Sequence, residues 1–316
     1  MKVLYICSGN KKAGLSPVVQ EQARSVEKEG IHIDYYLIRG RGIQGYLKAV
    51  FELKKHLNKH AYNLFHAHYS LSAIVASLAG ARPLVVSLMG SDIHANLISL
   101  LIVRSFKILF QWKVIVKSEE MYNRFGLKDI TIIPNGVDML RFRPLDRKEC
   151  LDKIQWDKSR IHILFAADSD RNEKNFEFAE KGVSLITEFR VDLHAVYSVP
   201  HINMVYYFNA ATLILITSKW EGSPNVIKEA MACNRPVVST DVGDVKWLIG
   251  EEAGHYISST KLPDLVENIK SAIDFADKYQ ETNGRERIFK LGLDSVSIAR
   301  GIIHIYKQVV DNACNN

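Results

Sequence analysis

One stretch of the chain decides its fold: residues 213–244 read LILITSKWEGSPNVIKEAMACNRPVVSTDVGD. Leu213–Thr217 is apolar and β-branched, which predicts a buried parallel strand, and Asn225–Cys233 has the composition of a helix, with Pro224 near its start. Glu221 then lies at the carboxyl end of the strand, and Glu229 lies about one and a half turns into the helix. In an open α/β sheet, ligands bind at this end of the strands.

The segment between the two carboxylates offers free backbone amides at a helix start, which favour a phosphate group. Glu221 and Glu229 flank it, and we expect them to accept hydrogen bonds from sugar-like hydroxyl groups. The alternative is that both are solvated charges that the helix dipole favours. The other residues expected at this site are Gly222, Ser223, Asn225 and Val226.

Strand-like apolar runs alternate with helical patterns along the chain, which predicts parallel sheets in an α/β protein. The first series ends at Pro134–Asp138, and residues 141–144 have the character of a linker. We therefore expect two doubly wound domains, residues 1–142 and 143–294, with the ligand cleft between them. The predicted strands are residues 3–7, 31–38, 64–66, 84–88, 114–116, 131–133, 161–166, 192–196, 213–217, 236–240 and 255–257.

The segment Ser218–Asp244 resembles the signature of the family 4 retaining glycosyltransferases of GT-B fold: Glu-Gly, a small loop, Glu-Ala-Met-Ala, a strand and Asp-Val-Gly. The resemblance implies two Rossmann-like domains. It also implies that Glu229 binds the ribose of a nucleotide and that Glu221 lies against the donor sugar. The last helix, within residues 295–316, is expected by the same resemblance to pack back on the first domain.

Residues 165–175 end a strand and open a helix, and they resemble the phosphate-binding element of that family. The resemblance implies that Arg171 and Lys174 grip the donor diphosphate, whose charge grows in the transition state. The alternative, a solvated helix start, places cations against the helix dipole. Asp168 and Asp170 match an Asp-x-Asp metal motif, but the two adjacent cations can neutralise a diphosphate, so we expect no metal and no cofactor.

Four residues of the first half are further candidates for contact with donor sugar or acceptor. Gly9 and Gly14 follow the first strand without dinucleotide-fingerprint spacing, and an ordinary strand-to-helix turn explains them equally well. His68 and Asp92 end two later strands, with hydrogen-bonded strand-end residues as the alternative. A common form of the family has His at the position of Met89, so a histidine-assisted step is not expected there.

Positive charge is concentrated in the first half, where residues 1–142 hold 19 Lys and Arg against 10 Asp and Glu. The basic excess favours salt-sensitive contact with an anionic membrane, with a solvated surface as the alternative. Nothing resembles a nucleic-acid-binding motif. The sequence shows neither a spanning segment nor a signal peptide, and its cysteines have no paired spacing. These features predict a cytoplasmic protein, peripheral at the inner membrane face, with reduced thiols.

The resemblance implies a retaining, metal-independent transfer of a sugar from a nucleoside-diphosphate sugar to an acceptor hydroxyl. The expected acceptor is a saccharide or lipid-linked saccharide, as in bacterial surface polysaccharide or glycolipid assembly. Two alternatives share the ligand: a GT-B-fold sugar-nucleotide epimerase and a non-catalytic sugar-nucleotide binder. Fold alone does not choose among the three.

Overall fold

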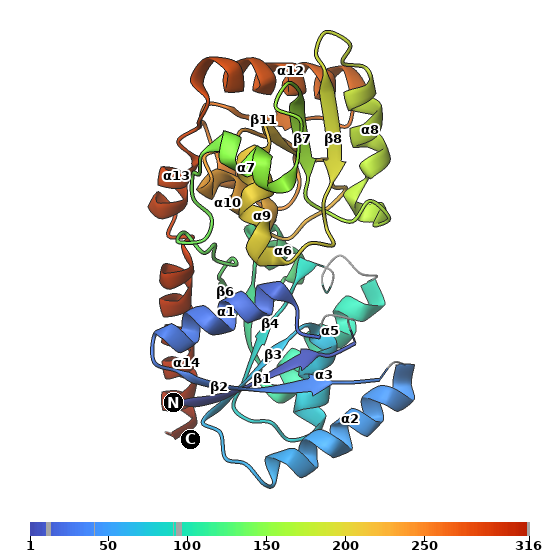
Figure 1. Ribbon diagram of the computed structural model, residues 1–316. Coiled ribbons are helices and arrows are strands. Elements are labelled where there is room, and N and C mark those ends of the chain that lie inside the picture. The colour runs from blue at the N-terminus through green and yellow to red at the C-terminus, as the bar shows by residue number, and fades with distance from the viewer. Residues whose placement is uncertain (11–13, 41, 91, 93–96, 315–316) are drawn as a thin grey trace. The chain divides into compact units, whose positions relative to one another are not determined.

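The computed structural model describes residues 1–10, 14–40, 42–90, 92 and 97–314, and it divides the chain into two units (Figure 1). The first unit joins Met1–Gly136 to Ser295–Asn316, and the second is Val137–Asp294. The division comes before residue 137, whereas the sequence placed it after residue 142.

The predicted linker at residues 141–144 is wrong for a physical reason. Phe142 is buried in the second unit, where its ring meets the edge of Phe208, with ring centroids 5.8 Å apart. Arg285 donates hydrogen bonds to the carbonyl oxygens of Phe142 (2.7 Å) and Met139 (2.7 Å). A buried aromatic ring and two hydrogen bonds from one guanidinium group attach this segment to the second unit, so it is part of that unit and not a linker.

The first unit contains a six-stranded parallel sheet of order β2-β1-β3-β4-β5-β6. Its strands are β1 (Lys2–Ser8), β2 (His32–Ile38), β3 (Leu64–His68), β4 (Leu84–Ser87), β5 (Lys113–Val116) and β6 (Ile130–Ile132). Its helices are α1 (Pro17–Lys28), α2 (Gly42–Leu57), α3 (Ser70–Leu78), α5 (Leu97–Phe110), α6 (Glu119–Phe125) and α14 (Ser295–Cys314).

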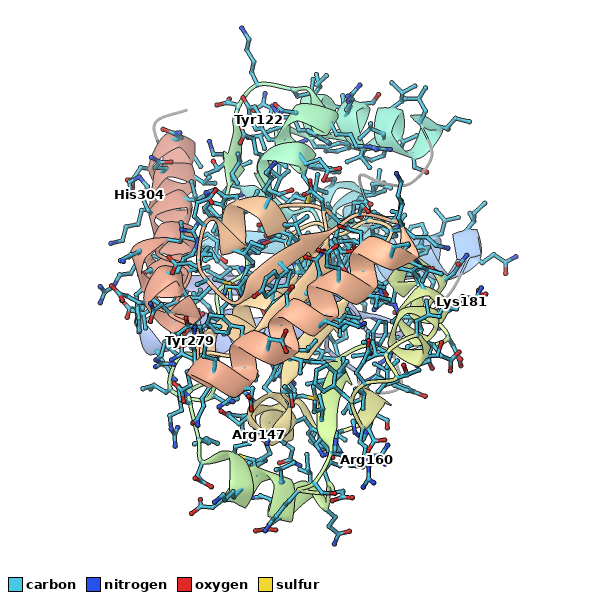
Figure 2. The ribbon with its side chains drawn as sticks, turned by 90° about the horizontal axis from the view of Figure 1, so that it is seen from above. Tyr122, Arg147, Arg160, Lys181, Tyr279 and His304 are labelled. Carbon is cyan, nitrogen blue, oxygen red and sulfur yellow. The ribbon has the colours of Figure 1, made fainter. Side chains whose placement is uncertain are left out.

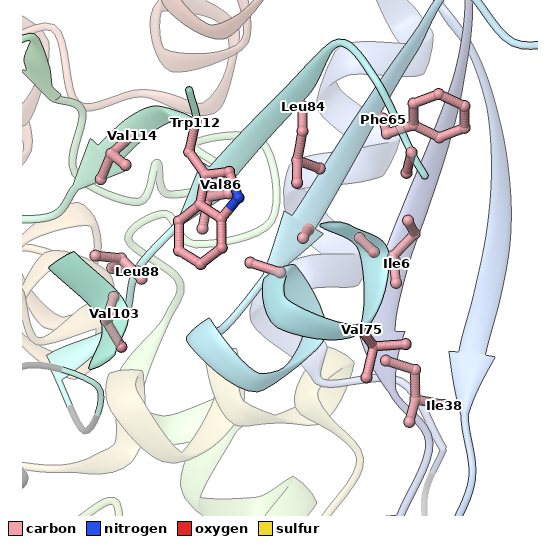
Figure 3. Close-up of a cluster of buried hydrophobic side chains, with 14 of the residues drawn as sticks. Ile6, Ile38, Phe65, Val75, Leu84, Val86, Leu88, Val103, Trp112 and Val114 are labelled. Atoms are coloured by element: carbon pink, nitrogen blue, oxygen red, sulfur yellow. The ribbon is translucent and has the colours of Figure 1, made fainter. Parts of the chain in front are cut away.

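Successive side chains of β1 point to opposite faces of this sheet, and each face has its own covering. Leu4 and Ile6 join the main buried cluster, to which α2, α3, α5 and α6 contribute apolar side chains. Figure 3 shows part of this cluster, with Ile6 of β1, Val75 of α3 and Val103 of α5 among its side chains. Tyr5, between them, points to the other face and hydrogen-bonds the hydroxyl of Tyr306 on α14 (2.9 Å). The last helix is therefore fastened to the first sheet by a buried polar contact.

The second unit contains a five-stranded parallel sheet of order β11-β10-β9-β7-β8. Its strands are β7 (Ile161–Phe165), β8 (Val191–Ala195), β9 (Leu213–Ile216), β10 (Val237–Thr240) and β11 (His255–Ser258). Its helices are α7 (Arg147–Ile154), η1 (Asn172–Lys174), α8 (Phe176–Ser184), η2 (His201–Asn203), α9 (Met204–Ala210), α10 (Asn225–Ala232), α11 (Val245–Ile249), α12 (Leu262–Tyr279) and α13 (Gly284–Lys290).

The long helix α12 covers one face of this second sheet. Figure 2 shows it crossing the view, with Tyr279 at its end. Leu265 and Ile269 of α12 are fully buried in a cluster with strand residues of β7, β9 and β10, such as Ile163 and Leu213. Gly182 of α8 lies so close to Leu265 that an added Cβ would come within 2.6 Å of it. The apolar strand runs therefore form a core closed by α8 and α12.

Every strand of both sheets overlaps an apolar run that the sequence predicted. The fold class is confirmed: two parallel α/β sheets, each wound in both directions from its first strand. Cys7, Cys150 and Cys233 are buried free thiols, and the side chain of Cys314 lies outside the described residues. Among the described residues, no helix is long and apolar enough to cross a membrane.

Candidate functional site

The strand order of the second unit itself marks where a ligand should bind. From β7 the chain goes to β8 on one side, and it then returns to β9 on the other side. The carboxyl ends of β7 and β9 therefore form a topological switch point, where open α/β sheets bind ligands. The loop after β7 contains Arg171 and Lys174, and the loop after β9 contains Glu221.

Two of the predicted site residues, which the sequence assigned to separate segments, form an ion pair in the structure. Lys174 Nζ and Glu221 Oε1 lie 2.5 Å apart, and each side chain is only 15% exposed. Ser218 donates to the same oxygen (2.7 Å). Thr217, directly after β9, donates to the carbonyl oxygen of Lys174 (3.0 Å), so the two loops are fastened at their bases as well. The result is a cation and a carboxylate held together at the switch point.

Arg171 lies on the same loop but points its charge elsewhere. Its guanidinium pairs with Glu173 (Nη2–Oε1 2.5 Å), and its side chain is half-exposed. Burial raises the pKa of Glu173, but hydrogen bonds from its own backbone amide and from Arg171, together with the charges of Arg171 and Lys174, leave that pKa below its usual value. Each cation therefore has a carboxylate partner, but the Arg171 side chain is more exposed to an arriving anion than that of Lys174.

Glu229 has a partner that the sequence did not reveal. It lies in α10, largely buried, and its Oε1 is 2.8 Å from Nε2 of His201 in the short helix η2. Arg141 lies 3.5 Å from the other ring nitrogen, Nδ1. Because a guanidinium can only donate, this contact favours the tautomer in which Nε2–H donates to Glu229. The pairing joins residues that are far apart in the sequence, and no local motif signals it.

The start of α10 has the close backbone packing that the Asp-Val-Gly motif requires. Gly243 adopts a φ of +59°, and an added Cβ would lie 2.7 Å from the carbonyl oxygen of Gly222 and 2.9 Å from that of Glu221. Ser223 donates to Asp244 (2.5 Å), which anchors the loop before the helix. Gly243 therefore lets the loop after β10 support the backbone that displays Glu221.

Asn225 and Val226 form the first residues of α10, and no side chain caps the helix. The Asn225 Oδ1 atom is buried and has no hydrogen-bond partner among the described residues. The first amides of a helix lack partners within it, so this end is suited to bind an anion. The predicted phosphate contact at Ser223, Asn225 and Val226 remains a prediction.

Lys228 is a second residue whose place at the site the sequence did not indicate. Its side chain is completely buried on α10. Burial lowers the pKa of Lys228 to about 8, against the opposing charges of Asp244 and Glu229, which raise it. Burial likewise raises the pKa of Asp244, and Lys228 counteracts this shift. A buried charge cluster therefore lies directly beneath the candidate site. Two adjacent polar residues, Lys228 and Glu229, would not by themselves have indicated it.

The first unit has its own switch point, between β1 and β3. Gly9 follows β1, and its amide donates to the carbonyl oxygen of Ile38 (2.8 Å). An added Cβ there would lie 3.0 Å from the Leu37 side chain, so a larger residue would push its neighbours apart by a few tenths of an ångström. Gly14 has a φ of +73° with open space around it, and residues 11–13 between the two lie outside the described residues.

His68 ends β3 in this first switch region and is completely buried. Neither ring nitrogen has a hydrogen-bond partner among the described residues. Its ring stacks on that of His66, with centroids 4.3 Å apart. Burial, assisted by the charge of Lys117, lowers the pKa of His68 to about 3. The imidazole is therefore neutral near pH 7, and its contact with a ligand remains a prediction.

Asp92 holds the start of α3. Its Oδ1 accepts hydrogen bonds from the backbone amide (3.0 Å) and hydroxyl (2.7 Å) of Ser70, and its Oδ2 accepts one from the amide of Met89 (2.7 Å). Burial raises the pKa of Asp92, while these hydrogen bonds lower it. Both oxygens are thus engaged within the unit, which matches the structural alternative for this residue. Met89 itself is buried.

Possible metal ligands gather away from the switch point. His162, Asp192 and His194 on β7 and β8 bring their ligand atoms within 4.8 Å of one another. Asp192, however, pairs with Arg160 (2.5 Å), a cation that opposes metal binding. In the Asp-x-Asp triplet, Oδ1 of Asp168 accepts the amide of Asp170 (3.0 Å), a local turn that engages one carboxylate oxygen.

Two family descriptions match the chain in succession. "Glycosyltransferase Family 4" matches residues 16–141, and "Glycosyl transferases group 1" matches residues 149–274. A curated relative, the "Putative teichuronic acid biosynthesis glycosyltransferase TuaC" of Bacillus subtilis, is 26% identical over 234 residues. That alignment covers 66% of this chain and 60% of the relative, so the chain spans less than two thirds of the relative's length.

Solved structures show the same fold over nearly the whole chain. Sucrose-phosphate synthase from Thermosynechococcus elongatus superposes with a TM-score of 0.82 at 17% identity, covering 98% of this chain and 99% of the other. HepE from Anabaena, crystallised with UDP and glucose, superposes with a TM-score of 0.74 at 17% identity, covering 98% and 100%. With two family descriptions matched in order and a shared GT-B fold, the chain belongs to the family 4, or group 1, glycosyltransferases.

Proposed function

We propose that this chain is a retaining glycosyltransferase that moves a sugar from a nucleoside-diphosphate sugar to an acceptor hydroxyl. The observation that supports this most strongly is the Lys174–Glu221 pair at the switch point of the second unit, with Arg171 on the same loop. Glycosyl transfer needs positive charge at the leaving diphosphate and hydrogen-bond acceptors for the sugar. This group of residues supplies both.

In the proposed reaction, the bond between the anomeric carbon and the leaving phosphate oxygen breaks. The acceptor oxygen then bonds to the same face of the sugar, and the departing phosphate oxygen takes the acceptor's proton. Lys174 and Arg171 stabilise the charge that develops on the diphosphate. Glu221 accepts hydrogen bonds from the donor sugar, and Glu229 accepts them from the ribose. No metal is required, because the two cations perform its electrostatic role.

The donor is proposed to be a nucleotide sugar. The HepE structure supports this proposal, because that protein shares the fold and was crystallised with UDP and glucose. In this chain, Glu229 is held by His201, so a ribose would either join or replace that hydrogen bond. The amides of Ser223, Asn225 and Val226 are proposed to contact the diphosphate, with Gly222 allowing its close approach.

The acceptor is proposed to bind to the first unit and to be a saccharide or lipid-linked saccharide. The assignment of TuaC to teichuronic acid biosynthesis supports surface polysaccharide assembly, and the basic first half supports peripheral contact with an anionic membrane at its cytoplasmic face. Gly9, Gly14, His68 and Asp92 are the residues proposed to line this side. The integral hydrogen bonds of Asp92 favour a positioning role for it.

Donor binding and transfer are tested in two stages. Thermal unfolding is first measured with a panel of nucleotide sugars, because a ligand that binds only the folded state raises the melting temperature. The best donor is then incubated with and without saccharide acceptors, and the products are followed by mass spectrometry. A glycosylated acceptor with retained anomeric configuration supports the proposal.

The two alternatives give different products in the same experiment. An epimerase converts the free nucleotide sugar to its isomer without any acceptor. A non-catalytic binder stabilises against heat but leaves donor and acceptor unchanged across the whole panel. Either outcome contradicts the proposed transfer.

A further inference from the structure

Helix α5 presents an apolar face to solvent. Its Leu100 and Val103 are buried in the core of the first unit, which fixes the inward side of the helix. The outward side consists of large apolar residues that are each between 46% and 71% exposed. They are Leu97, Ile98, Leu101, Ile102, Ile108 and Leu109. Their spacing follows the helical repeat, so α5 is apolar on both faces.

The apolar surface continues over the neighbouring helices. Along the first sheet α3 packs between α2 and α5, and all three cover the same face (Figure 1). On α2 the exposed apolar residues recur every fourth position, and α3 adds one near each end. These residues are Ile43, Leu47 and Phe51 on α2, and Leu71 and Leu78 on α3. We call the exposed apolar side chains of α2, α3 and α5 the apolar face.

Such a surface is unusual for a protein that meets only water. Scattered exposed apolar residues are ordinary, but contiguous patches mark surfaces that contact another apolar phase or protein. In the second unit, exposed apolar side chains such as Leu185, Trp247 and Tyr279 lie on different elements. In the first unit they are instead concentrated on three neighbouring helices, which is the pattern of a contact surface.

The charges on the same three helices indicate what kind of surface the apolar face contacts. Helix α5 has two cationic residues and no acidic residue, α3 has no charged residue, and α2 has three lysines against one glutamate. Lys54 and Lys55 are exposed at the end of α2, and Lys48 is exposed beside Glu52. A second protein surface would need acidic groups placed opposite these cations, whereas an anionic bilayer supplies negative charge above an apolar interior over its whole area.

We infer that the apolar face inserts into the interfacial region of an anionic lipid bilayer, with α5 lying in the membrane plane. The apolar side chains enter the acyl boundary, and the lysines of α2 remain among the headgroups. This inference rests on the proposed contact with an anionic membrane. It goes beyond that contact because it predicts an apolar contribution to membrane binding that salt does not remove. It is independent of the proposed glycosyl transfer.

The test uses the full chain and vesicles of phosphatidylcholine with or without phosphatidylglycerol. Flotation is measured at low salt and at about 0.5 M salt, where surface charges are largely screened. The variant Ile108→Gln/Leu109→Gln removes two exposed apolar side chains from the face, and Leu185→Gln/Tyr279→Gln removes two large, more than half-exposed ones from the second unit. We expect the first variant to bind at least about tenfold more weakly than the parent chain at high salt, and the second to bind like the parent.

Insertion is read directly from Leu109→Trp, whose fluorescence should be quenched by lipids brominated on the acyl chains. The same substitution at Leu185 should not be quenched. Thermal unfolding of each variant without lipid shows that the fold is retained, since the replaced side chains are exposed.

Several results would overturn the inference. If salt releases the parent chain completely and both glutamine variants behave alike, the contact is electrostatic only and the apolar face does not insert. If no vesicles are bound even at low salt, the proposed membrane contact is wrong as well. The proposed glycosyl transfer is tested separately, by the thermal stabilisation that a nucleotide sugar produces. If Ile108→Gln/Leu109→Gln converts a dimer to a monomer in sedimentation velocity, the occupant is a second copy of the chain.

Discussion

Lys174 and Glu221 form a largely buried ion pair, with Nζ and Oε1 2.5 Å apart, between the loops that follow β7 and β9. The pair brings together the cation proposed for the diphosphate and the carboxylate proposed for the sugar. Without a bound ligand, the positive charge of Lys174 is therefore neutralised by the negative charge of Glu221. An arriving diphosphate competes with Glu221 for the ammonium group and so links phosphate binding to the position of the carboxylate.

Replacing either cation should impair transfer. Arg171→Ala and Lys174→Ala each remove a charged hydrogen bond to the leaving group, which costs roughly 1.5–3 kcal/mol, or about tenfold to a hundredfold in kcat/KM. Steady-state kinetics with saturating acceptor measure the loss. Lys181→Ala, in an exposed pair with Glu177 on α8, is the matched control and should be near the parent value.

Lys174→Ala also leaves Glu221 without its partner, so the loss has to be separated from misfolding. In Lys174→Met/Glu221→Gln neither side chain is charged, and thermal stability should recover while transfer does not. Recovery of activity in this double variant would show that the pair is only structural.

Transfer should persist in saturating EDTA. The two cations of the loop after β7 supply the positive charge that a divalent metal gives other transferases, and one of the two Asp168 oxygens already accepts a backbone amide. Rates are compared before and after chelation and after addition of manganese. Loss of turnover on chelation, restored by manganese, would assign the Asp168–Asp170 triplet as a metal site instead.

Substitutions of Glu229 and Glu221 should affect different quantities, namely donor affinity and kcat. Glu229→Gln is expected to weaken donor affinity by about tenfold to a hundredfold through the ribose, and Glu221→Gln to lower kcat more than affinity. Calorimetric donor binding and kinetics on the same preparations give both values. His201→Asn tests positioning: it removes the hydrogen bond to Glu229 and should weaken donor binding less than Glu229→Gln does. Unchanged binding and turnover in both glutamine variants would refute the assignment.

The sequence predicted the strands because their apolar, β-branched runs are local signals that burial reinforces. It also located Glu221 and Lys174 on loops at the carboxyl ends of strands. It did not predict that they touch, because the contact depends on β9 returning next to β7. It did not predict the hydrogen bond between His201 and Glu229 either, because that bond depends on η2 coming close to α10 in the folded unit. The linker was wrong because Arg-Phe-Arg-Pro looks like surface sequence until Phe208 and Arg285 close around it.

The apolar face of the first unit was also missed, although its residues were plain in the sequence. A run such as residues 97–110 has apolar side chains on every side of the helix, which is normally a sign of complete burial. Only the exposure of each side chain in the folded unit shows that half of them face outward. Net charge alone, which the sequence does give, predicted a membrane contact of a purely electrostatic kind.

The buried cluster beneath α10 should be sensitive to loss of one charge. Lys228→Met leaves Asp244 buried without its nearby cation, and we expect a loss of about 3 kcal/mol in the free energy of unfolding. Adding Asp244→Asn should restore most of it, because the amide oxygen still accepts from Ser223. Urea denaturation of the two variants measures the difference. Lys270→Met, in the more exposed pair with Glu188, is the control and should cost under about 1 kcal/mol. Equal losses for Lys228→Met and the double variant would show that the two charges are uncoupled.

His255 should make the second unit less stable in acid. Burial, assisted by the charge of Arg287, lowers the pKa of His255 to about 4, and both ring nitrogens lack partners among the described residues. Because the pKa is depressed on folding, only the unfolded chain takes up the proton as the pH falls below about 6.5. Stability is therefore lost between that value and the folded pKa, by about 2 kcal/mol from pH 7 to pH 5.

His255→Leu removes this proton uptake, so its free energy of unfolding should fall by about 2 kcal/mol less than that of the parent chain over the same interval. Urea denaturation at both pH values, followed by tryptophan fluorescence, measures the two differences. His304→Leu, which replaces an exposed histidine on α14, is the matched control for the loss of one imidazole. The same acid loss in His255→Leu and in the parent would mean that the unfolded chain does not gain its proton at this residue, and that the acid sensitivity arises at other histidines whose pKa is lowered, such as His66 and His68.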